Sequence, residues 1–154
     1  MAALVFENLD EFREMEGKSF PPGEWIPVTQ DMIDDFAKAT GDFQWIHVDA
    51  EKAAEHSPFG KTVAHGFLSL ALLSRLLGDA IRVRSATMGV NYGLNKVRFP
   101  SPVPVDSRIR LKGRVQELEE YRNNGLKITW HCAVEIEGSD KPACVAEFIS
   151  LMFE

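Results

Sequence analysis

The sequence predicts an α+β protein in which one antiparallel β-sheet wraps around a single long, buried central helix. Residues 64–78 carry apolar side chains over most of a helical circumference, which is typical of a helix covered on nearly every side. The second half of the chain instead alternates apolar and polar residues in long segments joined by short turns, which is typical of antiparallel strands. No internal repeat or linker-like stretch interrupts the 154 residues, so residues 1–154 are expected to form one domain.

Composition and charge indicate a globular protein and argue against nucleic-acid binding. Hydrophobic residues make up 45% and charged residues 26% of the chain, which is enough apolar material for a core. The formal net charge of -6 disfavours general attraction to DNA or RNA. An acidic N-terminus without a long apolar run predicts neither a signal peptide nor a membrane span. Cys132 and Cys144 lie in apolar alternating runs, so buried thiols and a cytoplasmic location are expected.

Capping residues mark the expected elements of the N-terminal half. An amphipathic segment over residues 4–15 is followed by a short strand over residues 24–28. Thr29 is suited to cap a helix that carries apolar residues at offsets of three and four. Gly41 stands where a left-handed residue ends such a helix, which puts the following residue on a loop.

Two further helices are expected before the strands begin. Asp49 is suited to cap a short helix over residues 50–55. The central helix begins near Ala64, and Gly78 is expected to end it. Its apolar residues predict that the sheet surrounds it.

The C-terminal half predicts four strands, over residues 88–99, 107–118, 126–136 and 143–153. Gly93 predicts a bulge in the first of them, and Asn123-Asn124-Gly125 is a strong hairpin signal between the second and third. Four basic residues alternate with the apolar positions of the second strand and predict a solvent-facing side: Arg108, Arg110, Lys112 and Arg114. Because such a sheet has unpaired edges, a homodimer is expected.

The stretch TGDFQWIHVDA, residues 40–50, places an acid and an imidazole five positions apart, at Asp42 and His47. On a helix these side chains would be turned away from each other, and on a strand they would lie on opposite faces. An irregular loop is therefore the expected conformation if both side chains serve one site.

Several blocks of the sequence together resemble the MaoC-like hydratases, the (R)-specific enoyl-CoA hydratase group with the hotdog fold. The blocks are TGDFQWIH, VDAEKA, TVAHGFLSLALLS and NKVRFPSPVPVDS, in that order, and the resemblance runs from about Thr29 to the C-terminus. It implies hydration of a trans-2-enoyl-CoA to the (R)-3-hydroxyacyl-CoA, and the reverse dehydration, in fatty acid metabolism. It also implies an acyl-CoA thioester as the partner and no cofactor.

The resemblance assigns roles to particular residues. The catalytic pair of the family falls on Asp42 and His47, which would grip one water molecule and move its protons. The backbone N–H of Gly66 would stabilise negative charge on the thioester oxygen. The family usually has Asn-Pro where Gln44 and Trp45 stand, and the Gln-Trp form is similar to a subgroup of the same family. Both residues are expected to contact substrate, as is Asn91; Trp45 would line the acyl pocket.

Structural alternatives exist for each of these residues. Asp42 could cap a turn with His47 bonded to backbone, and Gly66 could serve only helix–sheet packing. His65 is expected to orient the start of the central helix or to pack. The spacing of nine between His47, His56 and His65 matches no zinc motif, so no metal is expected.

Two other functions remain in competition with hydration. A thioesterase of the same fold would direct water at the thioester carbonyl, but the start of the central helix carries no acid of the kind many hotdog thioesterases use. A non-catalytic acyl-thioester-binding protein would need neither Asp42 nor His47. The acyl length, and the choice between CoA and acyl carrier protein, stay open.

Overall fold

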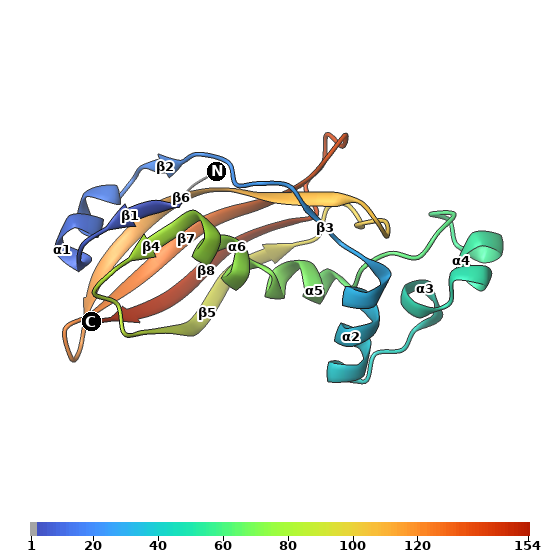
Figure 1. The fold of residues 1–154 in the computed structure, drawn as a ribbon, viewed down its shortest axis with the longest axis horizontal. Coiled ribbons are helices and arrows are strands. Elements are labelled where there is room, and N and C mark those ends of the chain that lie inside the picture. The colour runs from blue at the N-terminus through green and yellow to red at the C-terminus, as the bar shows by residue number, and fades with distance from the viewer. Residues whose placement is uncertain (1–2) are drawn as a thin grey trace.

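The structure is a computed structural model that describes residues 3–154, and Figure 1 shows its fold. A six-stranded sheet in the order β2-β6-β7-β8-β5, with β3 also paired to β6, curls around two consecutive helices, α5 and α6. Helices α2, α3 and α4 extend from one end of the sheet. The elements are β1 (Leu4–Phe6), α1 (Leu9–Phe12), the 3-10 turn η1 (Arg13–Met15), β2 (Ser19–Phe20), β3 (Ile26–Pro27), α2 (Gln30–Thr40), α3 (Trp45–Val48), α4 (Ala50–His56), α5 (Gly66–Ala71), α6 (Leu73–Ala80), β4 (Ile81–Val83), β5 (Met88–Arg98), β6 (Arg108–Tyr121), β7 (Gly125–Ile136) and β8 (Cys144–Phe153).

The long strands follow the sequence prediction closely. Strands β6, β7 and β8 are antiparallel neighbours, and β5 closes the sheet beside β8. Asn123 and Asn124 have positive φ angles of 58° and 57°, so the β6–β7 hairpin turns through two left-handed residues as a tight hairpin requires. The β5–β8 register shifts between Asn91 and Gly93, which confirms the bulge expected there.

The core lies between the concave face of the sheet and the helices. Alternate residues of β6 and β7 are buried on that face, as the period of two predicts: Ile109, Leu111, Val115, Leu126, Ile128, Trp130, Cys132, Val134 and Ile136. Leu73, Leu76 and Leu77 of α6 belong to the same cluster. Both cysteines are buried, and burial raises the pKa of the Cys132 thiol to about 12 and that of Cys144 to about 11. The prediction of buried thiols is therefore confirmed.

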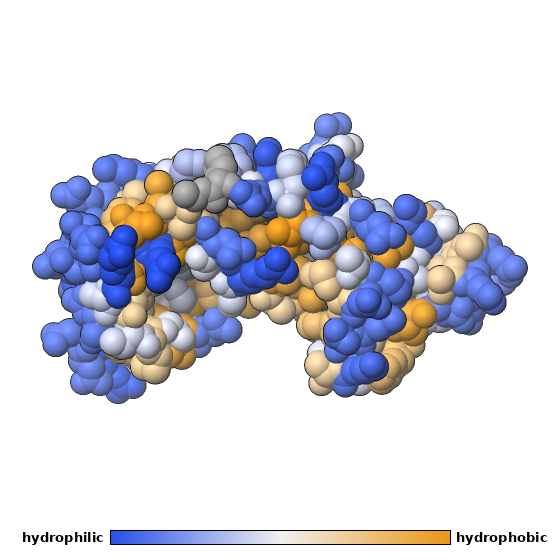
Figure 2. All heavy atoms as spheres, in the orientation of Figure 1, coloured by the Kyte–Doolittle hydropathy of each residue, from blue (hydrophilic) through white to orange (hydrophobic). Residues whose placement is uncertain are grey.

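The central helix differs from its prediction in continuity and in burial. It is split at Leu72 into α5 and α6, and it continues through Gly78 to Ala80, directly before β4. Along one side it faces solvent in this chain: Phe67 is 68% exposed, and Ala71 and Ser74 are exposed in line with it. Figure 2 shows apolar atoms reaching the surface around this helix pair. The prediction of one helix buried on nearly every side is wrong, because a single curled sheet covers only the side that packs on it.

The caps that hold the α2–α4 end together confirm the local sequence signals. Thr29 Oγ1 accepts a hydrogen bond from the backbone N–H of Met32, at 3.3 Å, at the start of α2. Gly41 ends α2 in the left-handed conformation with φ 80°. Asp49 Oδ1 accepts from the N–H of Lys52, at 3.0 Å, and so caps α4. These caps fix where the segment between α2 and α4 begins and ends.

Three short strands were not predicted. Strands β1 and β4 pair in parallel as a separate two-stranded ladder, and β2 pairs with β6 over two residues. Runs this short carry no measurable hydrophobic period. Among the described residues, 3–154, no helix is long and apolar enough to cross a membrane.

Candidate active site

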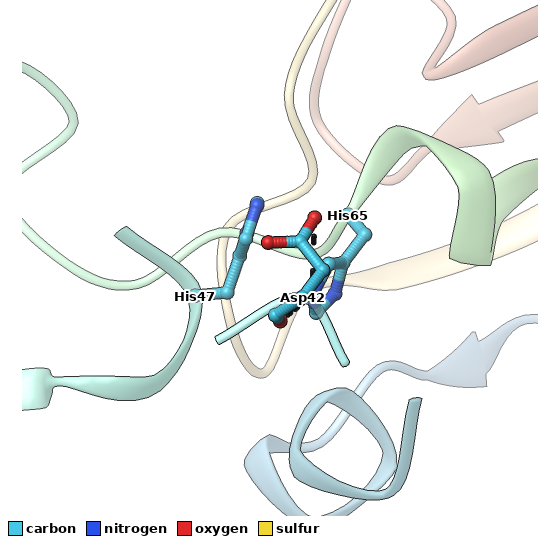
Figure 3. A group of neighbouring side chains, drawn as sticks. All are labelled: Asp42, His47 and His65. Atoms are coloured by element: carbon cyan, nitrogen blue, oxygen red, sulfur yellow. Dashed lines mark hydrogen bonds and ion pairs between the residues drawn. The ribbon is translucent and has the colours of Figure 1, made fainter. Parts of the chain in front are cut away.

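Asp42 and His47 lie at one site but on different secondary-structure elements. Asp42 lies on the loop after Gly41, as expected, whereas His47 lies on the one-turn helix α3. That turn is closed by the N–H of His47 donating to the carbonyl of Gln44, at 3.0 Å. The expectation that a loop carries both residues is therefore correct for Asp42 and wrong for His47. Figure 3 shows the two side chains together with His65.

The imidazole of His47 is buried and held in one tautomer. Its side chain lies 7% exposed, and its Nδ1 is 2.7 Å from the backbone carbonyl of Val63. Because a carbonyl only accepts hydrogen bonds, Nδ1 carries the hydrogen and Nε2 carries the lone pair in the neutral ring. Nε2 has no hydrogen-bond partner among residues 3–154. Burial lowers the pKa of His47 below its ordinary 6.5, and the neighbouring His65 lowers it further. This leaves a neutral base with a free lone pair.

The carboxylate of Asp42 combines a structural contact with an open side. Its Oδ1 accepts a hydrogen bond from the backbone N–H of Gln44, at 3.3 Å, which stabilises the turn. The side chain is 52% exposed, so a molecule arriving from solvent can reach it. Oδ2 lies 4.0 Å from Nε2 of His65. Asp42 thus does cap a turn, as the structural alternative proposes. This role takes only one long hydrogen bond to Oδ1 and leaves Oδ2 without a hydrogen bond among the described residues.

His65 is a third member of the site that sequence reasoning did not connect to the other two. Its ring stacks on that of His47 with centroids 3.8 Å apart and planes inclined by 23°. Its Nε2 lies 3.0 Å from the backbone carbonyl of Asp42. The residue immediately precedes α5, so it links the Asp42 loop and α3 to the start of that helix.

These three residues are also close enough to raise the question of a metal ion. Asp42, His47 and His65 each offer one ligand atom, and these atoms lie within 4.8 Å of one another. Ligand bonds from histidine to a metal such as zinc are about 2.0–2.1 Å and lie in the ring plane. Since the rings of His47 and His65 are stacked, their in-plane lone pairs run side by side and do not converge on one ion. The geometry therefore fits a stacked pair of histidines better than a metal centre.

Gly66 begins α5 directly after His65. As the first residue of the helix its N–H has no partner within the helix, and it makes no other hydrogen bond in the part of the chain that the structure describes. A Cβ at this position would lie 3.2 Å from the ring of Phe99. Close packing therefore accounts for the absence of a side chain here, and the free N–H is a separate feature of the same residue.

The remaining residues from the sequence prediction lie at different distances from this cluster. Gln44 and Trp45 are part of the same turn as His47, but the Trp45 ring faces Lys52 of α4, whose Nζ is 4.8 Å from the ring centroid. Asn91 instead lies on β5, where it lines two adjoining cavities of about 290 Å³ and 370 Å³. Both cavities lie between the helix pair and strands β5 and β8, and their walls include Ser74 and Phe148.

The fold and this site together describe a class of protein: a hotdog protein in which an acid on a loop and a buried histidine on a one-turn helix meet at one site. The sequence profile of the MaoC like domain family matches residues 11–133. The chain belongs to this family, the MaoC-like dehydratase domains, and this membership supports a lyase-type enzyme. The fold and family expected from the motif resemblance are thereby confirmed.

Individual relatives agree with this assignment. The chain is 48% identical over 145 residues to 3-hydroxyacyl-thioester dehydratase Z of Mycobacterium tuberculosis, which covers 94% of this chain and 95% of that protein. It is 45% identical over 137 residues to Nodulation protein N of Rhizobium leguminosarum bv. viciae, covering 88% of this chain and 85% of that protein. Among solved structures, the (R)-hydratase from A. caviae involved in PHA biosynthesis superposes with a TM-score of 0.68 at 21% identity, covering 86% of this chain and 95% of the other. This structural likeness bears on the fold alone.

Proposed function

We propose that the protein is an (R)-specific enoyl-CoA hydratase and dehydratase, which adds water to a trans-2-enoyl-CoA to give the (R)-3-hydroxyacyl-CoA. One observation carries the proposal: the open carboxylate of Asp42 and the free Nε2 lone pair of His47 lie at one site. A carboxylate and a neutral imidazole are the groups that can hold a single water molecule and move its protons. The name of the M. tuberculosis relative, a 3-hydroxyacyl-thioester dehydratase, supports an acyl thioester as the substrate class.

The reaction divides one water molecule between two adjacent carbon atoms. Asp42 and His47 orient the water so that its oxygen bonds to the β-carbon while one of its protons leaves to the pair. The pair then returns a proton to the α-carbon, so that the carbon–carbon double bond is consumed and no co-reactant is required. Negative charge develops on the thioester oxygen during the addition, and the free N–H of Gly66 is the proposed donor to it. Dehydration runs through the same steps in reverse.

The proposed substrate contacts extend from this centre in two directions. Gln44 and Trp45 flank the catalytic pair on the turn of α3 and are proposed to contact the substrate next to the reacting carbons, with Trp45 lining the start of the acyl pocket. Asn91 and the apolar walls of its two cavities are proposed to receive the acyl chain. Leu77, Phe148 and Leu151 line the first cavity, and Leu70 and Phe148 line the second. Such walls suit a hydrocarbon chain with few polar contacts.

A direct assay separates this function from its two rivals. Crotonyl-CoA is incubated with the protein, and the ultraviolet absorbance of the conjugated enoyl thioester is followed together with free thiol. We expect absorbance to fall while no CoA thiol is released, because hydration removes the double bond and leaves the thioester intact. Release of thiol would indicate a thioesterase. Unchanged absorbance across short and long acyl chains, with binding retained, would indicate a non-catalytic binding protein.

The pH dependence follows from the lowered pKa of His47. A general base acts in its neutral form, and a pKa below the ordinary value keeps that form populated to lower pH. We therefore expect the decline of kcat/KM for hydration at low pH to have its midpoint below pH 6.5. The measurement is a pH profile with crotonyl-CoA in a buffer of constant ionic strength. An inflection above pH 6.5 would contradict the assignment of His47 as the neutral base.

We propose that residues 1–154 act as one domain and pair with a second copy to form a homodimer. Strand β5 is an edge of the sheet, and its exposed large side chains recur at every second position: Met88, Val90, Tyr92 and Leu94. Phe67, on the exposed side of α5, lines the same cavity as Tyr92 and Leu94. An apolar row of this length on an unpaired edge is typical of a surface that a second copy covers.

A charge on this row should therefore dissociate the dimer. Tyr92→Glu is expected to sediment as a monomer at a micromolar concentration at which the unaltered protein sediments as a dimer. Val5→Glu is the matched control, since Val5 is 46% exposed and Tyr92 is 52% exposed, but Val5 lies on β1. Sedimentation of the unaltered protein as a monomer would contradict the proposal.

A further inference from the structure

We infer that His65 is a positioning residue, which holds the Asp42 loop and the ring of His47 in the geometry that the reaction needs. The inference rests on the proposed function, because it concerns the residues assigned there to the water. His65 is 3% exposed, so it acts through its neighbours and not through a direct contact with bulk solvent.

The first contact fixes the Asp42 loop. Nε2 of His65 is 3.0 Å from the backbone carbonyl of Asp42, and a carbonyl only accepts, so Nε2 donates. This hydrogen bond ties the residue that carries the carboxylate to the start of α5. No other hydrogen bond to that carbonyl is present within residues 3–154, so the position of the loop relative to α5 depends on it.

The second contact fixes the ring of His47. The rings of Phe36 from α2, His65 and His47 lie in sequence, with centroid distances of 4.9 Å and 3.8 Å. Besides its covalent bond to Cβ, the ring of His47 is held by the hydrogen bond from Nδ1 to the carbonyl of Val63. The stacked ring of His65 covers one face of it and restricts its rotation, so the free Nε2 keeps its direction.

The third feature is the second ring nitrogen of His65. Its Nδ1 is buried without a hydrogen-bond partner among the described residues, so the bond from Nε2 to Asp42 is the one hydrogen bond that this ring makes there. The ring is therefore held by that bond and by the rings of Phe36 and His47. The titratable groups that act on His47 are His65 and Asp42.

Three variants separate the two contacts. His65→Gln keeps an amide donor near the position of Nε2 but has no ring, whereas His65→Phe keeps a ring but has no donor. His65→Ala has neither. The rate of crotonyl-CoA hydration is measured for each at saturating and limiting substrate, and His56→Ala, which removes an exposed histidine, is the control.

We expect kcat to fall by about 100-fold in His65→Ala, because a displacement of roughly 1 Å in a reacting group costs about 100-fold in rate. In His65→Gln and His65→Phe, each of which keeps one of the two contacts, kcat should fall by about 10-fold. KM should change far less, since substrate-binding groups remain. The acid limb of the kcat/KM profile should also move to higher pH in His65→Ala, because water replaces the ring that covers His47 and the pKa of His47 rises. A residue with a purely structural role would lower the melting temperature without moving this limb.

The outcomes keep the inference and the proposed function distinguishable. If folded His65→Ala turns over at the normal rate while Asp42→Asn and His47→Gln are inactive, only the role of His65 is overturned. If all three turn over normally, the proposed function itself is overturned. Should His65→Ala fail to fold, the test passes to His65→Gln, where an unchanged kcat and an unchanged pH profile would overturn the inference.

Discussion

Asp42→Asn and His47→Gln are each expected to lower kcat for crotonyl-CoA hydration by at least about 100-fold, and by up to about 10,000-fold, the range of general acid–base catalysis. Asparagine keeps an oxygen that can accept from the N–H of Gln44, so the turn survives while the charge is lost. Glutamine keeps polar atoms near those of the imidazole but cannot take up and return a proton. KM should move far less, because most contacts with the CoA portion lie elsewhere.

The double variant tests whether the two residues act as a unit. If Asp42 and His47 bind the same water molecule, neither residue is effective alone. Removing both should then lower kcat by about as much as removing either one. Additive losses would indicate two independent contributions. Near-normal turnover in both single variants would show that the catalytic assignment is wrong.

Melting temperatures distinguish a catalytic role of Asp42 from a purely structural role in the turn. Asp42 is half exposed on a loop, so Asp42→Asn should lower the melting temperature little. Asp35→Asn, an exposed acid on α2, and His56→Gln are matched controls and should leave both kcat and the melting temperature unchanged. Activity lost only through unfolding would favour Asp42 as a structural turn residue.

Gly66→Pro is expected to lower kcat by about 100- to 1,000-fold relative to Gly66→Ala, the usual effect of removing one oxyanion donor. Both variants add a Cβ against the ring of Phe99, so both should show the cost of displacing that ring. Only proline also removes the N–H. Proline is tolerated at the first position of a helix, and His65 already has the extended ψ of 137° that a following proline favours.

The ratio of the two Gly66 variants is the informative quantity. Steady-state kinetics of both, with melting temperatures measured in parallel, gives that ratio with the effect of the added Cβ removed. Equal kcat values for the folded alanine and proline variants would show that the N–H of Gly66 does not take part. In that case the glycine would be explained by its packing against Phe99 alone.

Local signals in the sequence were sufficient for the scaffold of the site. Thr29, Gly41 and Asp49 act on atoms within four residues of themselves, and each was placed correctly from the sequence. The alternation in β6 and β7 was equally reliable, because the period of two follows from strand geometry and one face is buried. Family resemblance, and not periodicity, supplied the chemical assignment of Asp42 and His47.

Contacts between distant parts of the chain could not be predicted in the same way. The stacking of His65 on His47 joins residues 18 positions apart, and the carbonyl of Val63 that fixes the tautomer is a backbone group with no sequence signature. The spacing of the histidines suggested separate roles, whereas the fold brings two of them into contact. The exposed side of α5 and α6 was likewise missed, because a sequence does not reveal whether an apolar face is covered by its own chain.

The most direct test of the central claim follows the oxygen of the water. Crotonyl-CoA is incubated with the protein in ¹⁸O-labelled water, and the products are analysed by mass spectrometry and chiral chromatography. We predict an intact thioester that carries one ¹⁸O on its β-carbon in the (R) configuration, formed by the unaltered protein and not by Asp42→Asn. The claim would be contradicted if the label appeared in a free carboxylate with release of CoA. It would also be contradicted if no enoyl thioester gave a labelled product.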